Sequence, residues 1–173
     1  MALKEITASE MELSTLRIGG DWMLITAGTA ETGFNTMTAS WGHLGSIWGH
    51  GKDALTSVVY VRPQRYTKEF VDRADTYTVC FFPEEYKKDM SYLGSVSGRD
   101  EKDKISKTSL TPLFVDDTTA FAEASLVLVC RKLYHAPLVA EGFVDRSILP
   151  QHYAANDLHE MYIGEIVKVL VQE

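Results

Sequence analysis

Residues 35–67 read NTMTASWGHLGSIWGHGKDALTSVVYVRPQRYT, and the interpretation of the whole chain starts from this stretch. A β-branched run within it ends in Arg62 and Arg65, and its early short hydroxyl side chains are Thr36, Thr38 and Ser40. Hydroxyl donors, free backbone N–H groups and a guanidinium fork are the groups that bind a phosphate. The stretch therefore predicts an anion site, although alternating threonine and serine are also typical of the solvent face of a sheet.

The length and composition predict one globular domain over residues 1–173. A chain of 173 residues buries roughly 70% of the surface that its unfolded form exposes, which is enough for a sizeable core. Hydrophobic residues make up 45% and charged residues 24%, so neither a disordered nor a fibrous protein is indicated. The net charge of −7 argues against nucleic acid or an anionic membrane as a partner, because both attract a positive surface.

The N-terminal segment and the two cysteines predict a cytoplasmic protein. Charges are scattered through residues 1–15, which argues against a signal peptide or an anchor, and no apolar run reaches membrane-spanning length. Cys80 and Cys130 lie in apolar, strand-like runs without CxxC spacing. We therefore expect buried, reduced thiols in preference to a disulfide or a metal pair.

The segments on either side of this central stretch alternate between strand-like runs and turn-forming residues. Asp21–Gly28 and Phe34–Trp41 are separated by a polar turn, and together they predict a hairpin. Glycines and histidines predict a loop over residues 42–51, after which the β-branched run Ala54–Val61 resumes as a strand. Pro63 ends that strand because proline cannot donate to a ladder.

Two short helices and one further strand are predicted next. Thr67 is a good N-cap for a short amphipathic helix. Thr76–Phe82 predicts a strand, and Pro83–Gly94 predicts a helix that begins at the proline. The charge-dense run Ser95–Lys107 predicts an exposed loop.

The two longest apolar runs, Glu123–Tyr134 and Met161–Val171, are apolar on both faces in their middle. Strands of this kind belong in a closed barrel or a covered sheet. The helices are too few and too irregular for a βαβ repeat. The sequence therefore predicts a mainly antiparallel β-barrel with a few peripheral helices, without a second domain.

Several catalytic motifs fail on their spacing or context. Gly49–Ala54 fits the loose dinucleotide fingerprint, but a β-branched strand follows it where a helix is required. The histidines show no zinc-ligand pattern, so no metal site is expected, and no serine lies in a G-x-S-x-G elbow. Glu160 and Glu165 beside His159 offer an acid/base alternative, yet carboxylates near a strand end are more often capped or solvated.

Four blocks, in order along the chain, carry a resemblance to a known family. They are Phe34–Gly42, Val59–Pro63 with Arg65–Thr67, Ser97–Asp100 and Met161–Ile166. The sequence resembles the flavin reductase-like proteins with an FMN-binding split barrel, including flavoredoxin-type members, from about Asp21 to the C-terminus. The resemblance implies a Greek-key split β-barrel and a homodimer, with FMN held non-covalently at or near the subunit interface.

The resemblance also implies which residues contact the cofactor. The hydroxyl block would hold the ribityl chain or its phosphate, with Met37 and Trp41 near the ring, and the arginine block would complete the phosphate end. Backbone groups of Val59–Val61 would meet the polar edge of the isoalloxazine. For His159 and Tyr162 the resemblance leaves flavin contact, dimer contact and core packing open, and His152 receives no role. The predicted cofactor-binding residues are Asn35, Thr36, Met37, Thr38, Ser40, Trp41, Tyr60, Val61, Arg62, Arg65, Thr67, Ser97, Gly98 and Arg99.

The implied activity is that of an oxidoreductase in which the flavin supplies the difficult chemistry. The leading interpretation is an enzyme that uses NAD(P)H to reduce FMN, and no side chain is singled out as catalytic. The alternatives are an FMN-containing electron carrier reduced by a protein partner and a flavin-binding module without turnover. The residues do not distinguish NADH from NADPH, nor do they identify the electron acceptor.

Overall fold

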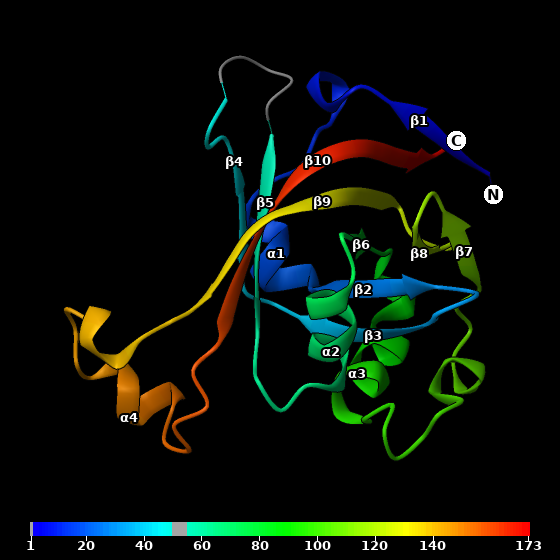
Figure 1. Cartoon of the computed structure of the whole chain (residues 1–173). Helices are drawn as coiled ribbons and strands as arrows, with labels where there is room; N and C mark the ends of the chain where they lie inside the picture. Colours follow the sequence, from blue (N-terminus) through cyan, green and yellow to red (C-terminus); the bar gives the residue numbers. More distant parts are fainter. Residues whose placement is uncertain (1, 50–54) are drawn as a thin grey trace.

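A curled antiparallel β-sheet dominates the computed structural model, which describes residues 2–49 and 55–173 (Figure 1). Within these residues, eight strands form one sheet in the order β3-β2-β6-β9-β10-β5-β4, with β1 paired to β10. A separate hairpin consists of β7 and β8. The strands are β1 (Leu3–Ile6), β2 (Met23–Thr29), β3 (Gly33–Ala39), β4 (Gly42–Gly45), β5 (Thr56–Val61), β6 (Thr76–Phe81), β7 (Pro112–Val115), β8 (Thr118–Phe121), β9 (Leu126–Pro137) and β10 (Glu160–Gln172). This architecture confirms the predicted antiparallel β-barrel, in its split form.

The helices are short, and two of them lie against the first hairpin (Figure 1). Helix α2 contacts β2 and β3, and α3 contacts β3. The helical elements are α1 (Leu16–Asp21), α2 (Tyr66–Arg73), α3 (Lys87–Ser95), α4 (Ile148–His152) and the 3-10 turns η1 (Ala8–Glu10), η2 (Glu84–Tyr86), η3 (Lys104–Lys107) and η4 (Ala140–Gly142). The N-cap of α2 is Arg65 and not Thr67 as predicted, because the Thr67 hydroxyl accepts a hydrogen bond from Asn35 Nδ2 at 2.8 Å.

The hairpin of β2 and β3 forms as the sequence predicts. Its register pairs Met23 with Ala39 at one end and Thr29 with Gly33 at the other. Gly28 and Gly33 flank the turn with φ angles of 101° and 72°, a region that residues with a side chain rarely adopt. The two glycines therefore allow the tight reversal that brings β3 back along β2.

The middle of the sheet is buried on both faces, as the continuous apolar runs of β9 and β10 predict, since residues 126–130 of β9 and 162–164 of β10 are buried without alternation. Successive residues of β2, Leu24 and Ile25, pack into different clusters, one between the sheet and α3 and the other inside the curl. Cys80 and Cys130 divide between the same two clusters, and both are free, fully buried thiols as predicted. Burial raises the pKa of both thiols to about 12, because a thiolate in an apolar core loses its hydration.

The split of the barrel lies between β3 and β4. These strands are the two ends of the main sheet path, yet only Ser40 and Trp41 separate them along the chain. The chain thus crosses directly from one edge of the curled sheet to the other. Edge strands carry backbone groups without ladder partners, so the crossing at Ser40 and Trp41 has polar backbone available for a ligand.

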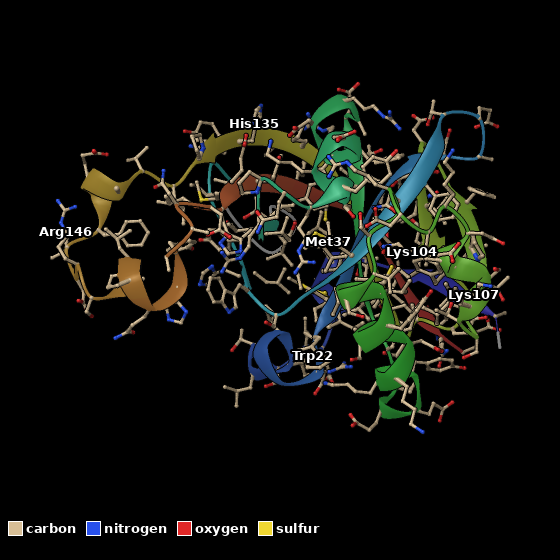
Figure 2. All side chains as sticks on the ribbon, turned by 90° about the horizontal axis from the view of Figure 1, so that it is seen from below. Trp22, Met37, Lys104, Lys107, His135 and Arg146 are labelled. Atoms are coloured by element: carbon tan, nitrogen blue, oxygen red, sulfur yellow. The ribbon has the colours of Figure 1, made fainter. Side chains whose placement is uncertain are left out.

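An arm, residues 138–159, leaves the barrel between β9 and β10 and carries η4 and α4 (Figure 1). Figure 2 shows Arg146 at the outer end of this arm, far from Met37 near the centre of the molecule. The two chain ends lie side by side, since the Glu173 amide donates to the Ala2 carbonyl at 3.1 Å. None of the helices within the described residues has the length and apolar character needed to cross a membrane.

Several elements differ from the sequence prediction. Strand β4 occupies part of the predicted 42–51 loop, because Gly42–Gly45 pairs with β5 from Val59 to Thr56. The predicted positions His50 to Ala54 lie outside the described residues. The run Ser95–Lys107 is not wholly exposed, since Lys104 is buried. Strands β1, β7 and β8 are short and were missed.

Candidate functional site

Three neighbouring hollows meet at the crossing from β3 to β4, and Ser40 lines all of them. The first, called here the polar hollow, has a volume of about 220 Å³. Its lining residues are Met37, Thr38, Ala39, Ser40, Trp41, Tyr60, Arg62, Arg65 and His159. The second, the aromatic hollow, has a volume of about 410 Å³ and shares Ser40, Trp41 and Tyr60 with the first. The third lies toward α3 and also has about 220 Å³.

Local sequence explains why these side chains converge. Ser40 and Trp41 follow the end of β3, and Tyr60 lies near the end of β5. The pairing of β4 with β5 ends at Gly42 and Val59, so Tyr60 lies just beyond it. Pro63 then turns the chain, so that Arg62 and Arg65 flank the start of α2. Arg65 is the N-cap of α2, and both arginines line the polar hollow.

Arg65 is the more accessible of the two arginines. It is exposed, lines the polar hollow, and donates from Nη1 to the Gly94 carbonyl at the end of α3 at 3.0 Å. The other nitrogens of its guanidinium form no hydrogen bond within the part of the chain that the structure describes. Arg65 therefore retains donors for an anionic group.

Arg62 is half-buried and holds the arm. Its guanidinium forms an ion pair with Asp157, donates from Nη2 to the His152 carbonyl at 3.0 Å, and lies 5.2 Å from the centre of the Tyr153 ring. Gln64 supports the same carboxylate, donating to Asp157 at 2.8 Å. Arg62 thus positions the arm against the hollow as well as lining it.

His159 lies at the wall of the polar hollow among aromatic rings. Its ring centre is 4.9 Å from that of Trp41, and its Nδ1 lies 2.9 Å from the Tyr153 hydroxyl. Burial, together with the nearby Arg62, lowers the pKa of His159 to about 4. The imidazole is therefore neutral at pH 7. Because His159 lines the polar hollow, its position is compatible with ligand contact, one of the three roles that the sequence left open.

Seven of the predicted residues line the polar hollow, and seven do not. Thr36 is fully buried and shares a 2.7 Å hydrogen bond with Thr26, whereas Val61 is fully buried in the barrel core. Asn35 and Thr67 are bonded to one another below the surface. The alternation along β3 does not reveal which hydroxyls are covered by β2, so the sequence could not separate Thr36 from Thr38.

The loop with Ser97, Gly98 and Arg99 packs against the start of α2 and not in the polar hollow. The Arg99 guanidinium pairs with Glu69, donates to the Gln64 carbonyl at 3.3 Å, and lies 4.9 Å from the centre of the Tyr66 ring. A Cβ atom at Gly98 would overlap the Asn35 side chain, so the loop approaches β3 closely there. This loop supports the segment that carries Arg65.

Lys104 is a buried cation behind the site that sequence reasoning missed. Only 3% of it is exposed, and its Nζ donates to the carbonyls of Thr36 (2.7 Å), Val96 (3.2 Å) and Leu93 (3.5 Å). No carboxylate pairs with it in residues 2–49 and 55–173. Burial, with a smaller contribution from Arg65, lowers the pKa of Lys104 to about 8. Lys104 therefore joins the end of α3 to β3.

We expect Lys104 to give the protein a distinct pH dependence. The folded-state pKa of about 8 lies below the ordinary lysine value of 10.5, so between these values the unfolded chain binds the proton more often than the folded chain. The free energy of unfolding should therefore gain, from this group, roughly 1.4 kcal/mol per pH unit above pH 8. Urea unfolding measured from pH 7.5 to 10 should show that the free energy of unfolding of the wild type increases relative to that of Lys104→Met.

Lys107 serves as the control because it lies in the same 3-10 turn, η3, but is exposed (Figure 2). The Lys107→Met variant should follow the wild-type pH dependence. If Lys104→Met keeps a constant difference from the wild type across this pH range, the lowered pKa of Lys104 is contradicted.

Asp72, His135 and Glu160 form a cluster whose ligand atoms lie within 4.8 Å of one another, a grouping that the sequence pattern did not reveal. The Lys68 ammonium already lies between the two carboxylates, 2.7 Å from Asp72 and 2.8 Å from Glu160. Tyr162 is fully buried here and donates its hydroxyl to Asp72. Tyr162 thus packs in the core and anchors this ion-pair network, away from the polar hollow.

The polar hollow fits an extended ligand with an anionic end and a flat ring. Arg65 offers a cationic fork, and the Ser40 hydroxyl makes no hydrogen bond within the described chain and is available as a donor. Trp41 is 41% exposed and presents a flat ring beside these polar groups. A phosphate, hydroxyl groups and an aromatic ring system in one molecule, as in FMN, match this set of groups.

Comparisons with known proteins were made for the sequence and for the structure. No protein-family model and no curated protein sequence matches the chain. Solved structures do match, among them an FMN-binding domain of a flavin reductase-like enzyme from Shewanella baltica, with a TM-score of 0.70 and 15% identity over 98% of this chain and 76% of that one. Flavoredoxin of Desulfovibrio vulgaris matches with a TM-score of 0.65 and 20% identity over 95% and 76% of the two chains.

A third similar structure is nitrilotriacetate monooxygenase component B from Bacillus cereus, with a TM-score of 0.66 and 18% identity over 88% of this chain and 69% of that one. Identities at this level establish a shared fold, and activity has to be argued from the site. The order of strands, the split between β3 and β4 and these structural matches agree with the resemblance found in the sequence. The chain therefore has the split-barrel fold of the flavin reductase-like proteins.

Proposed function

We propose that residues 1–173 act as one FMN-binding domain and that FMN lies at the crossing from β3 to β4. The observation that carries this proposal is the polar hollow at this crossing, whose lining brings together Arg65, Ser40 and Trp41. The names of the similar structures, which include FMN-binding proteins and flavoredoxin, support the same cofactor.

The residues at the hollow would bind and orient the cofactor. Arg65, close to the start of α2, binds the phosphate, and Ser40 donates to the ribityl chain. Trp41 supports the ring, and the neutral imidazole of His159 lies at the same wall without adding a charge. Thr38 donates its hydroxyl to the Met90 carbonyl, so it offers only its oxygen lone pairs to the ligand. When bound, FMN supplies a ring that accepts a hydride at N5.

We infer that the protein is an oxidoreductase with NAD(P)H as the electron donor. A flavin reductase among the similar structures supports this activity. The alternative, an FMN-containing electron carrier, is supported by the flavoredoxin matches. The test is the absorption spectrum of the FMN-loaded protein under anaerobic conditions after NADH or NADPH is added. Bleaching of the flavin bands supports the reductase; bands that bleach only with a reduced protein partner support the carrier.

We also propose a homodimer in the cytoplasm. Two buried free thiols are typical of a reducing compartment. A surface groove of about 530 Å³ supports the dimer. Trp48 and Tyr134 line this groove, are 66% and 45% exposed, and have ring centres 6.2 Å apart. Exposed apolar surface of this kind is typical of an interface. A second copy of the chain is its proposed partner.

A single charge in that groove should separate the dimer. We expect Tyr134→Glu to shift the mass from dimer to monomer at low micromolar concentration, because the new carboxylate would lose its hydration while Arg131, the one cation in the described lining of the groove, is already paired with Glu165. Light scattering after size-exclusion chromatography measures the mass. Val144→Glu, at a fully exposed position of the arm, is the control and should remain dimeric. A wild-type protein that is monomeric under these conditions would rule out the proposed dimer.

A further inference from the structure

The aromatic hollow differs in chemistry from the polar hollow that it adjoins. The Tyr60 ring meets the His43 ring edge to face, with centres 5.8 Å apart, and Trp41 and Tyr153 line the same space. Aliphatic wall is added by Ile18 and Leu138. Flat rings and branched aliphatic groups around one space favour a planar ligand, which can contact both.

The charges of the two hollows are also different. The polar hollow has two arginines in its lining, Arg62 and Arg65. In the described part of the chain, the aromatic hollow has no lysine, arginine, aspartate or glutamate in its lining. An ion placed there would lose hydration without gaining a partner, so an uncharged ligand is favoured. The hydroxyl of Tyr60 is a neutral donor, since burial raises its pKa.

We propose that the aromatic hollow is a binding site for an uncharged, planar aromatic or conjugated ring compound, and that this compound is the second substrate. The binding site follows from the lining alone. Its assignment to a substrate rests on the proposed function, because only a flavin in the polar hollow would make the neighbouring ligand a reaction partner. A ring with a neutral carbonyl group meets this description, whereas a carboxylate or a pyrophosphate does not.

Two adjacent glycines of α1 allow the hollow to be filled without disturbing the core. Gly19 lines the aromatic hollow, Gly20 does not, and a Cβ atom at either position would meet no atom within 4 Å. Leucine at both positions should be tolerated equally by the helix. Gly19→Leu is therefore expected to narrow the hollow, and Gly20→Leu is its matched control.

The arm offers a second pair of variants that changes charge in place of volume. Leu138 lines the hollow, whereas its neighbour Val139 is 54% exposed and does not. A lysine at position 138 would place a cation at the wall, and a lysine at position 139 would place the same cation outside. The Leu138→Lys variant should therefore favour an anionic ring over a neutral one.

The experiment is isothermal titration calorimetry of the full chain with 2-naphthamide and 2-naphthoate, which are similar in shape and differ in charge. We expect 2-naphthamide to bind at least about tenfold more tightly than 2-naphthoate, because the lining provides no countercharge. Gly19→Leu should weaken 2-naphthamide binding by about tenfold or more, with Gly20→Leu unchanged. Leu138→Lys should reverse the preference between the two probes, and Val139→Lys should not.

The titrations are repeated with saturating FMN so that the two proposals can fail separately. Unchanged 2-naphthamide binding in the presence of FMN supports two neighbouring sites. Displacement of 2-naphthamide by FMN, equal affinity for the two probes, or no binding of either would overturn the aromatic site. Absence of FMN binding alongside selective 2-naphthamide binding would instead remove the proposed function and leave the site.

Discussion

The Arg65→Ala variant should bind FMN roughly 10- to 150-fold more weakly than the wild type, because a charge-assisted contact is worth about 1.5–3 kcal/mol. Its affinity for riboflavin, which lacks the phosphate, should change little. The selectivity is expected because the Arg65 guanidinium is exposed at the polar hollow and, within the described residues, donates only to the Gly94 carbonyl. Quenching of flavin fluorescence measures both affinities.

Two other arginines make this result specific. Arg73→Ala, at the far end of α2, is the control and should bind FMN as the wild type does. Arg62→Ala should weaken both flavins, since Arg62 also holds the arm through Asp157 and the His152 carbonyl. An Arg65→Ala variant with unchanged FMN affinity, or with equal losses for FMN and riboflavin, would remove Arg65 from the phosphate site.

The Gly28→Ala variant should lose about 3 kcal/mol or more of its free energy of unfolding. Gly28 has a φ angle of 101°, and a Cβ atom there would overlap the Gly33 carbonyl oxygen and lie 2.8 Å from Phe34 Cα. The overlap is with backbone, which cannot rotate away as a side chain would. The hairpin that carries Thr38 and Ser40 would therefore have to shift.

Gly33 in the same turn provides the matched control. Its φ angle is 72°, but a Cβ atom there would meet nothing within 4 Å. Gly33→Ala should therefore lose only about 1–2 kcal/mol, the strain of a left-handed backbone without a clash. Urea unfolding of the two variants measures the difference. Equal losses for both variants would contradict the close approach of Gly28 to β3.

Much of the sheet could be predicted from sequence because its central strands have strong patterns. The β2–β3 hairpin has two strand-like runs around a polar turn, and the long apolar runs of β9 and β10 include stretches that are buried on both faces. The short edge strand β4 (Gly42–Gly45) was missed, since a glycine-rich segment has the composition of a loop. The register that makes it a strand comes from β5, a tertiary effect that local sequence does not contain.

The site was predicted in its location and only partly in its members. Ser40, Trp41 and Arg65 lie together because they flank the ends of β3 and β5. Thr36 has the same side-chain chemistry as Thr38 but is covered by Thr26, whose position depends on the pairing of β2 with β3. The sequence predicted an exposed loop around Lys104 because the neighbouring residues are charged. Only the fold shows that three carbonyls accept hydrogen bonds from Lys104.

The most direct test of the proposed cofactor is a titration of FMN and of riboflavin into the purified protein, followed by flavin fluorescence and absorbance. We expect saturable binding of a single FMN per chain, tighter than riboflavin by roughly tenfold or more, because Arg65 is expected to contact the phosphate. Absence of FMN binding at concentrations up to about 100 μM would contradict the claim that the polar hollow binds FMN, because a cofactor site should bind more tightly than that.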